Sequence, residues 1–78
     1  MTLKEFREIL GRRPFVPFRL LMSSGESHEV RHPEMAWLTR TSIFVGTGDF
    51  KDGVPEEFRI CSLLHVATIE SLETPHAA

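Results

Sequence analysis

The sequence predicts a mainly β fold of the α+β class, in which a short N-terminal helix precedes a five-stranded, strongly bent antiparallel sheet. Apolar residues recur at helical spacing only as far as Leu10. Pro14 and Pro17 then exclude a helix interior, because proline has no amide donor and its ring clashes with the preceding turn. Beyond them, short apolar runs alternate with turn residues, which is typical of small antiparallel β domains.

The predicted helix covers residues 2–10. Thr2 and Glu5 stand three apart, the spacing of a capping box, in which each side chain accepts a hydrogen bond from the other residue's backbone amide. Gly11 is a typical residue at a helix C-cap. The apolar stripe of this helix consists of Leu3, Phe6, Ile9 and Leu10. A helix this short is marginal alone, so its stripe is expected to pack on the rest of the domain.

The next two predicted strands form a hairpin. Residues 15–22 alternate as a strand with large apolar side chains on both faces, so we expect both faces to be covered, one of them by the helix. Pro17 removes one ladder donor and places this end of the strand at a sheet edge or a bend. Residues 23–26 have the composition of a tight turn, and residues 27–32 alternate again.

The second half of the chain contains the remaining predicted elements. Pro33 ends the second strand and can begin a turn of helix, and Asp52-Gly53 marks the tip of a loop rich in glycine and acidic residues. The expected segments are an irregular or helical crossing at 33–38, a third strand at 41–46, a loosely structured loop at 46–57, a fourth strand at 58–61, a turn at 62–64 and a fifth strand at 65–72.

The composition predicts one small cytoplasmic domain. The chain has 78 residues, with a single domain expected at residues 1–73 and a frayed tail at 74–78. Nine basic and eleven acidic residues give a net charge of −2, so the broad positive surface typical of nucleic-acid binders is missing. Cys61 is the only cysteine, which excludes an intramolecular disulfide and disfavours a secreted domain of this size. We expect neither a leader segment nor a membrane partner, since no apolar run approaches a span of about 20 residues.

Two resemblances extend this prediction. A helix followed by five strands, with a brief turn before the last, resembles the layout of Sm-like and SH3-like small barrels; an open α+β sheet is the alternative. The segments 13–18, 30–34 and 64–70, with Gly25 between the first two, resemble a group of small bacterial proteins of the planctomycete type. Their shared pattern is RPFxPF…G…VxHPE…IE. This resemblance spans residues 3–70 and implies no activity, so it transfers no functional residue.

Histidines and the cysteine supply the candidate catalytic or metal-binding groups. His32 and Glu34 stand two apart and could grip a ligand or act as acid and base, although helix-start chemistry explains both residue types. His65 could join them from another strand, which gives a weaker metal-binding or hydrolytic alternative. His28 and His32 share a strand face but lie about 13 Å apart, too far to bind one ion. Cys61 lacks an oxyanion hole and an orienting acid, so we expect it in the core. No catalytic residue, metal ligand or cofactor is therefore predicted.

Arginines and aromatic residues supply the candidate partner contacts. A basic patch could form from Arg7, Arg12, Arg13, Arg19, Arg31 and Arg40, and Arg12 and Arg13 lie close to Phe15 in the sequence. Arginines interleaved with aromatic residues would suit single-stranded RNA binding of the Sm-like kind, but the net charge disfavours this alternative. Trp37 is expected to plug an open end of the barrel. Phe50, within the acidic loop, is the better candidate for an exposed interface.

The function predicted from the sequence is a small non-enzymatic binding or interaction module that associates with itself or with another protein. Burial of apolar groups would drive this association, together with pairing of exposed strand edges near Pro17 or at residues 41–45. The residues expected to contact a ligand or a partner are Arg12, Arg13, Arg31, His32, Glu34 and Phe50.

Overall fold

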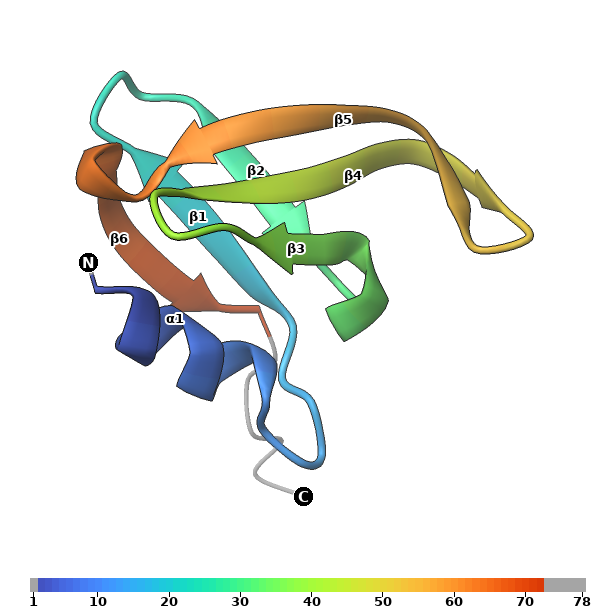
Figure 1. The fold of residues 1–78 in the computed structure, drawn as a ribbon, viewed down its shortest axis with the longest axis horizontal. Helices are drawn as coiled ribbons and strands as arrows, with labels where there is room; N and C mark the ends of the chain where they lie inside the picture. Colours follow the sequence, from blue (N-terminus) through green and yellow to red (C-terminus); the bar gives the residue numbers. More distant parts are fainter. Residues whose placement is uncertain (1, 73–78) are drawn as a thin grey trace.

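One α-helix and six strands make up the part of the chain that the structure, a computed structural model, describes, residues 2–72 (Figure 1). The helix is α1 (Leu3–Leu10), the strands are β1 (Phe18–Met22), β2 (Ser27–Val30), β3 (Ala36–Leu38), β4 (Ser42–Lys51), β5 (Val54–Ser62) and β6 (Val66–Ser71), and two short 3₁₀ turns are η1 (Pro33–Met35) and η2 (Leu63–His65). The predicted tail at 74–78 lies outside the described residues.

The strands form two antiparallel three-stranded sheets, with the orders β2-β1-β6 and β3-β4-β5. The α+β class is confirmed, but the prediction of five strands is wrong, and the strands between residues 2 and 72 do not close into a barrel. The missed strand is β3, which follows η1 within the predicted crossing at 33–38. Because β2 ends at Val30 and η1 carries the chain away, β2 and β3 belong to different sheets.

The predicted cap of α1 is confirmed. The Thr2 hydroxyl accepts a hydrogen bond from the Glu5 amide at 3.1 Å, and the Glu5 carboxylate accepts one from the Thr2 amide at 3.2 Å. Hydrogen bonds from Thr2 also hold the pKa of Glu5 below its usual value. At the other end the Gly11 amide donates to the Arg7 carbonyl at 2.9 Å, so the helix ends where the sequence predicts.

The predicted hairpin of β1 and β2 is confirmed, with shorter strands. Phe18 pairs with Val30 at one end, and Gly25, at a φ of 96°, turns the chain at the other. β1 begins at residue 18 rather than 15, after both prolines. The prediction of an edge strand near Pro17 is wrong, because β1 lies between β2 and β6; the Pro17 carbonyl instead accepts a hydrogen bond from the Leu72 amide at 2.9 Å.

The segment predicted as a loose loop at 46–57 is instead the outer part of a long hairpin of β4 and β5. Figure 1 shows this hairpin extending beyond the rest of the chain. Asp52 and Gly53 form its tip with φ of 54° and 77°, as a two-residue type I′ turn requires. Gly48, at a φ of 77°, lies where the register shifts between Thr47 and Phe50, which marks a β-bulge. The glycines therefore serve turns and bends of a strand pair. The central position of β4 also makes the predicted edge at 41–45 wrong.

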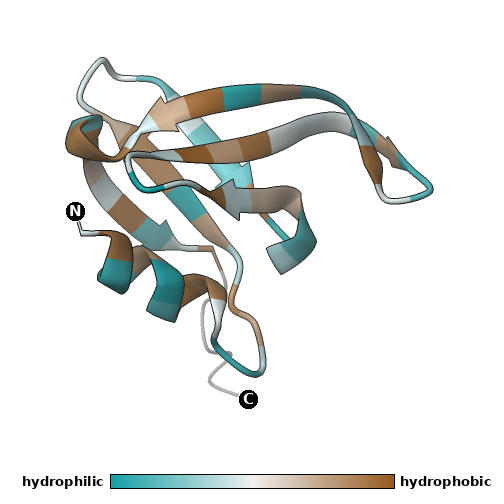
Figure 2. Ribbon diagram, in the orientation of Figure 1, coloured by the Kyte–Doolittle hydropathy of each residue, from teal (hydrophilic) through white to brown (hydrophobic). Residues whose placement is uncertain are grey.

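The core lies between the two sheets, and α1 lies on the β1–β6 side of it (Figure 1). Phe6 reaches into the core from α1, and its ring meets the Phe18 ring edge-on at 5.8 Å. Hydrophobic residues are frequent on the strands in the body of the molecule, whereas the far half of the β4–β5 hairpin is mostly white and teal, with brown segments near its tip (Figure 2). The buried apolar residues are Phe6, Phe18, Leu20, Val30, Ala36, Ile43, Val45, Cys61, Leu63 and Val66.

Candidate interaction surface

His32, Glu34 and His65 do not form one site. His32 lies at the N-cap of η1 without a side-chain cap hydrogen bond, and Glu34 is exposed on the same turn. The His65 ring lies 3.4 Å from the Ser23 hydroxyl, beside the turn that precedes β2, whereas His32 follows the far end of β2. The two imidazoles therefore lie beside opposite ends of β2, whose four residues span about 13 Å of extended chain. No group of three metal-ligating side chains occurs among residues 2–72.

Cys61 is a core residue, as predicted. Its side chain is buried on the inner face of β5, paired across from Ile43, and burial raises the pKa of its thiol. A buried thiol with a raised pKa holds little thiolate and is a poor nucleophile. His65 is exposed at the end of η2, and among residues 2–72 its ring contacts the Ser23 hydroxyl and not Cys61.

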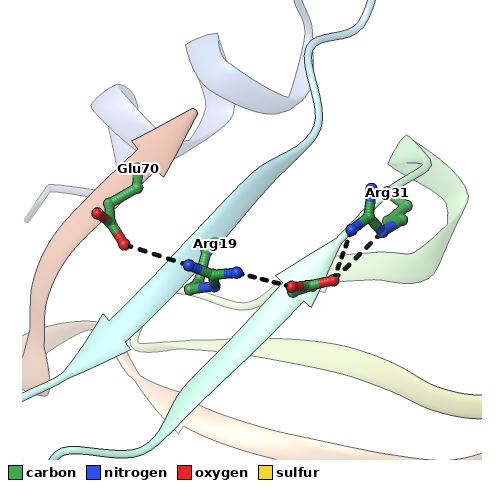
Figure 3. Close-up of polar contacts among 4 residues, drawn as sticks. Arg19, Arg31 and Glu70 are labelled. Atoms are coloured by element: carbon green, nitrogen blue, oxygen red, sulfur yellow. Dashed lines mark hydrogen bonds and ion pairs between the residues drawn. The ribbon is translucent and has the colours of Figure 1, made fainter. Parts of the chain in front are cut away.

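The polar outer face of the β2-β1-β6 sheet carries an ion-pair network centred on Glu29. Arg19 lies between two carboxylates, 3.0 Å from Glu29 and 3.7 Å from Glu70, and Arg31 donates two hydrogen bonds to Glu29, at 3.0 and 3.2 Å (Figure 3). Arg31, a predicted ligand contact, is thus occupied within the chain. Arg12 and Arg13 are exposed after α1, where Arg13 donates a hydrogen bond to the Arg12 carbonyl at 3.0 Å.

Replacing Glu29 by glutamine is expected to reduce the fall in the free energy of unfolding that the wild type shows as the pH is lowered. The guanidiniums of Arg19 and Arg31 lower the pKa of Glu29 in the folded chain. The stabilisation that this shift reports is therefore complete above the ordinary carboxyl pKa of 4.5, and it is lost as the pH falls through the lower folded-state pKa. Urea denaturation at neutral pH and at several acidic pH values measures the effect as the change in the free energy of unfolding.

Glu34→Gln is the matched control, because the Glu34 carboxylate has no ion-pair partner among the described residues. High salt is expected to shrink the difference between the Glu29 variant and the wild type, since exposed charges are screened. Equal acid sensitivity of the Glu29→Gln variant and the wild type would contradict the assignment.

The predictions for the exposure of Trp37 and Phe50 are both wrong. Trp37 does not plug a barrel end: its side chain is 44% exposed, because Ala36 and Leu38, its neighbours on β3, face the core and Trp37 faces away from it. Phe50 is half-buried instead of exposed. A Cβ at Gly46 would lie 2.6 Å from the Phe50 ring and 3.0 Å from Pro55, so both side chains lie against bare backbone.

Trp37 belongs to a larger apolar surface, which we call the outer apolar face. Trp37 pairs with Phe44 on β4, and Phe44 pairs with Ile60 on β5, so the three side chains form a row across the sheet. Phe58 follows on β5, and its ring stacks on Phe44 with centroids 5.6 Å apart. Phe58 and Ile60 are 52% and 61% exposed. A contiguous apolar surface of this kind is typical of a contact site.

Sequence reasoning missed the outer apolar face, although one signal was present. In residues 58–61 the apolar side chains alternate with Arg59, and Cys61 is expected in the core. Strand alternation then places Phe58 and Ile60 on the face opposite Cys61, away from the core.

Two hollows in the surface lie away from the predicted acid-base residues. The first is lined, at the tip of the β4–β5 hairpin, by Asp49, Lys51, Asp52, Val54, Pro55 and Glu56. The second is lined, beside the start of α1, by Leu3, Arg40, Thr41, Ser62, Leu63 and Leu64. His32, Glu34 and His65 line neither of them.

The described residues contain no helix of the length and apolar character needed to cross a membrane. Comparison of the chain with models of protein families, with curated proteins and with solved structures found no match.

Proposed function

We infer that the chain is a non-enzymatic interaction module that associates with itself through the outer apolar face. The observation that carries this proposal is the row of Trp37, Phe44 and Ile60, extended by Phe58, in which Phe44 is half-buried and the other three side chains are exposed. A domain of this size gains stability by covering such a surface, because burial of a large apolar side chain contributes about 1.5–3 kcal/mol. Aromatic residues in the centre of a contact surface are also the usual energetic anchors of an interface.

Replacing Ile60 by lysine is expected to weaken self-association by at least about tenfold, because a charge in the centre of a contact surface loses its hydration on binding. Sedimentation velocity over a dilution series measures the effect as a shift of the dissociation constant. Thr68→Lys on β6 is the control, since Thr68 is exposed on the other sheet and its replacement adds the same charge away from the outer apolar face.

A wild-type chain that stays monomeric at the highest concentration overturns self-association. If the Ile60→Lys variant and the wild type associate equally tightly, the contact does not involve the outer apolar face. Weakening in the Ile60→Lys variant alone supports the proposal.

A nucleic-acid binder resembling the Sm-like barrels has less support. Arg19 and Arg31 are paired with Glu29, which leaves fewer free cations for phosphates. The net charge of −2 also disfavours it. The hydrolytic or metal-binding alternative needs His32, Glu34 and His65 together, and β2 separates His65 from the other two.

A further inference from the structure

The free edge of β5 carries the features of a self-pairing strand. β5 is the last strand of its sheet, so one row of its backbone amides and carbonyls faces away from β4. It spans nine residues, which is far longer than β3 at the opposite edge. Figure 1 shows it along the outside of the projecting hairpin. An exposed edge of this length invites pairing with another strand.

We propose that two copies of the chain pair β5 with β5 in antiparallel fashion about a twofold axis at Phe58, which joins their two sheets into one. This inference rests on the self-association proposed above and names its partner, a second copy, and its register. A twofold contact uses the same surface on both copies, so β5 has to be complementary to itself.

The charges on β5 meet this requirement in one register. When Phe58 faces Phe58 of the second copy, Glu57 faces Arg59 of that copy, and Arg59 faces Glu57. Within residues 2–72 neither the Glu57 carboxylate nor the Arg59 guanidinium has an ion-pair partner, and both residues are exposed. Two cross-strand pairs of opposite charge therefore form without breaking any pair inside the chain, and such pairs stabilise antiparallel strands.

The same register joins the two outer apolar faces. Phe58 stacks on Phe44 within each copy, so facing Phe58 rings link two aromatic pairs across the axis. Ile60 lies diagonal to Phe58 of the second copy, a spacing that aromatic side chains can bridge. The two most exposed members of the outer apolar face, Phe58 and Ile60, both lie on the paired strand.

Glu56 is the residue that could oppose this register, because it faces Ile60 of the second copy. Its side chain, however, lies over Gly48 of β4, where a Cβ would collide with the Glu56 carboxylate and lie 2.9 Å from the Glu56 Cβ. The carboxylate is thus directed back along its own sheet and away from the free edge, and the contact does not bury its charge against the isoleucine.

Two charge reversals test the register. In a dimer of identical variant chains, Glu57→Arg places a new arginine opposite Arg59, and Arg59→Glu places a new glutamate opposite Glu57. Each variant alone is therefore expected to dimerise at least about tenfold more weakly than the wild type. A heterodimer of the two variants contains two cross-strand pairs. In one pair, the unchanged Arg59 of the Glu57→Arg chain faces the unchanged Glu57 of the Arg59→Glu chain. In the other pair, the two substituted residues face each other, and they also carry opposite charges. An equimolar mixture is expected to form this heterodimer with wild-type affinity, measured by sedimentation velocity with one variant fluorescently labelled.

The Glu34→Gln variant is the matched control, because it alters a charge on η1, far along the chain from β5. Circular dichroism and thermal melting check that both charge variants fold. Restoration by mixing supports the register. If both single variants dimerise as tightly as the wild type, and mixing them does not strengthen dimerisation, the register is overturned and the proposed self-association still stands. Assemblies larger than a dimer overturn the twofold contact in favour of pairing between β5 and a different strand edge.

Discussion

Replacing Phe6 by alanine is expected to lower the free energy of unfolding by about 3–5 kcal/mol. The Phe6 side chain is fully buried, and it is the buried residue through which α1 joins the core. Its removal leaves a cavity against Phe18, whose ring it meets at 5.8 Å. A chain of this length has a total stability of about 4–12 kcal/mol, so this single change removes a large part of it. Urea denaturation followed by far-ultraviolet circular dichroism measures the loss.

Phe58→Ala is the matched control, because it removes the same side chain from an exposed position. Its expected cost is below about 1.5 kcal/mol, the size of one stacked aromatic pair, and is measured at a concentration where the chain is monomeric. Equal losses in the two variants would show that α1 does not complete the core.

Local chemistry made the first third of the fold predictable. The cap at Thr2 and Glu5 and the end at Gly11 depend on neighbours within four residues, so the sequence contains all of the information. The β1–β2 hairpin is predictable for the same reason, since its turn at residues 23–26 is local. The same holds for the proline that begins η1.

The later part of the fold depends on pairing between distant residues, and there the sequence misleads. β3 has only three residues, and it is a strand because β4 supplies its partner, from Val45 back to Ile43. The glycines at 46, 48 and 53 indicate a loop by composition, yet in the structure they serve a close approach, a bulge and a type I′ turn. Composition does not distinguish a flexible loop from a sharply bent strand pair.

The position of the candidate surface could not be predicted from the sequence. Apolar contact and edge pairing were the expected mechanism, and they remain a proposal. The expected residues came from loops and charges, whereas the outer apolar face combines side chains from β3, β4 and β5. Its members become neighbours only after the register of three strands is known, because a shift of one residue would turn Trp37 or Ile60 towards the core.

Replacing Gly46 by alanine is expected to cost about 1–3 kcal/mol of stability through overpacking. A Cβ at this position would lie 2.6 Å from the tip of the Phe50 ring and 3.0 Å from the Cβ of Pro55. The ring can swing away, but Pro55 is held in β5 opposite Phe50, so part of the strain remains in the backbone of the hairpin. Thermal and urea unfolding of the Gly46→Ala variant measure the cost.

A double-mutant cycle with Phe50→Leu identifies the cause of that cost. If the Phe50 ring opposes the new methyl group, Gly46→Ala is expected to be at least about 0.5 kcal/mol less destabilising in the Phe50→Leu background than in the wild type. A cost that is the same in both backgrounds would assign the effect to Pro55 or to β4 itself. Because Gly46 pairs with Phe58 in the register of β4 and β5, a coupled result places this steric conflict directly beside the strand that carries the proposed dimer contact.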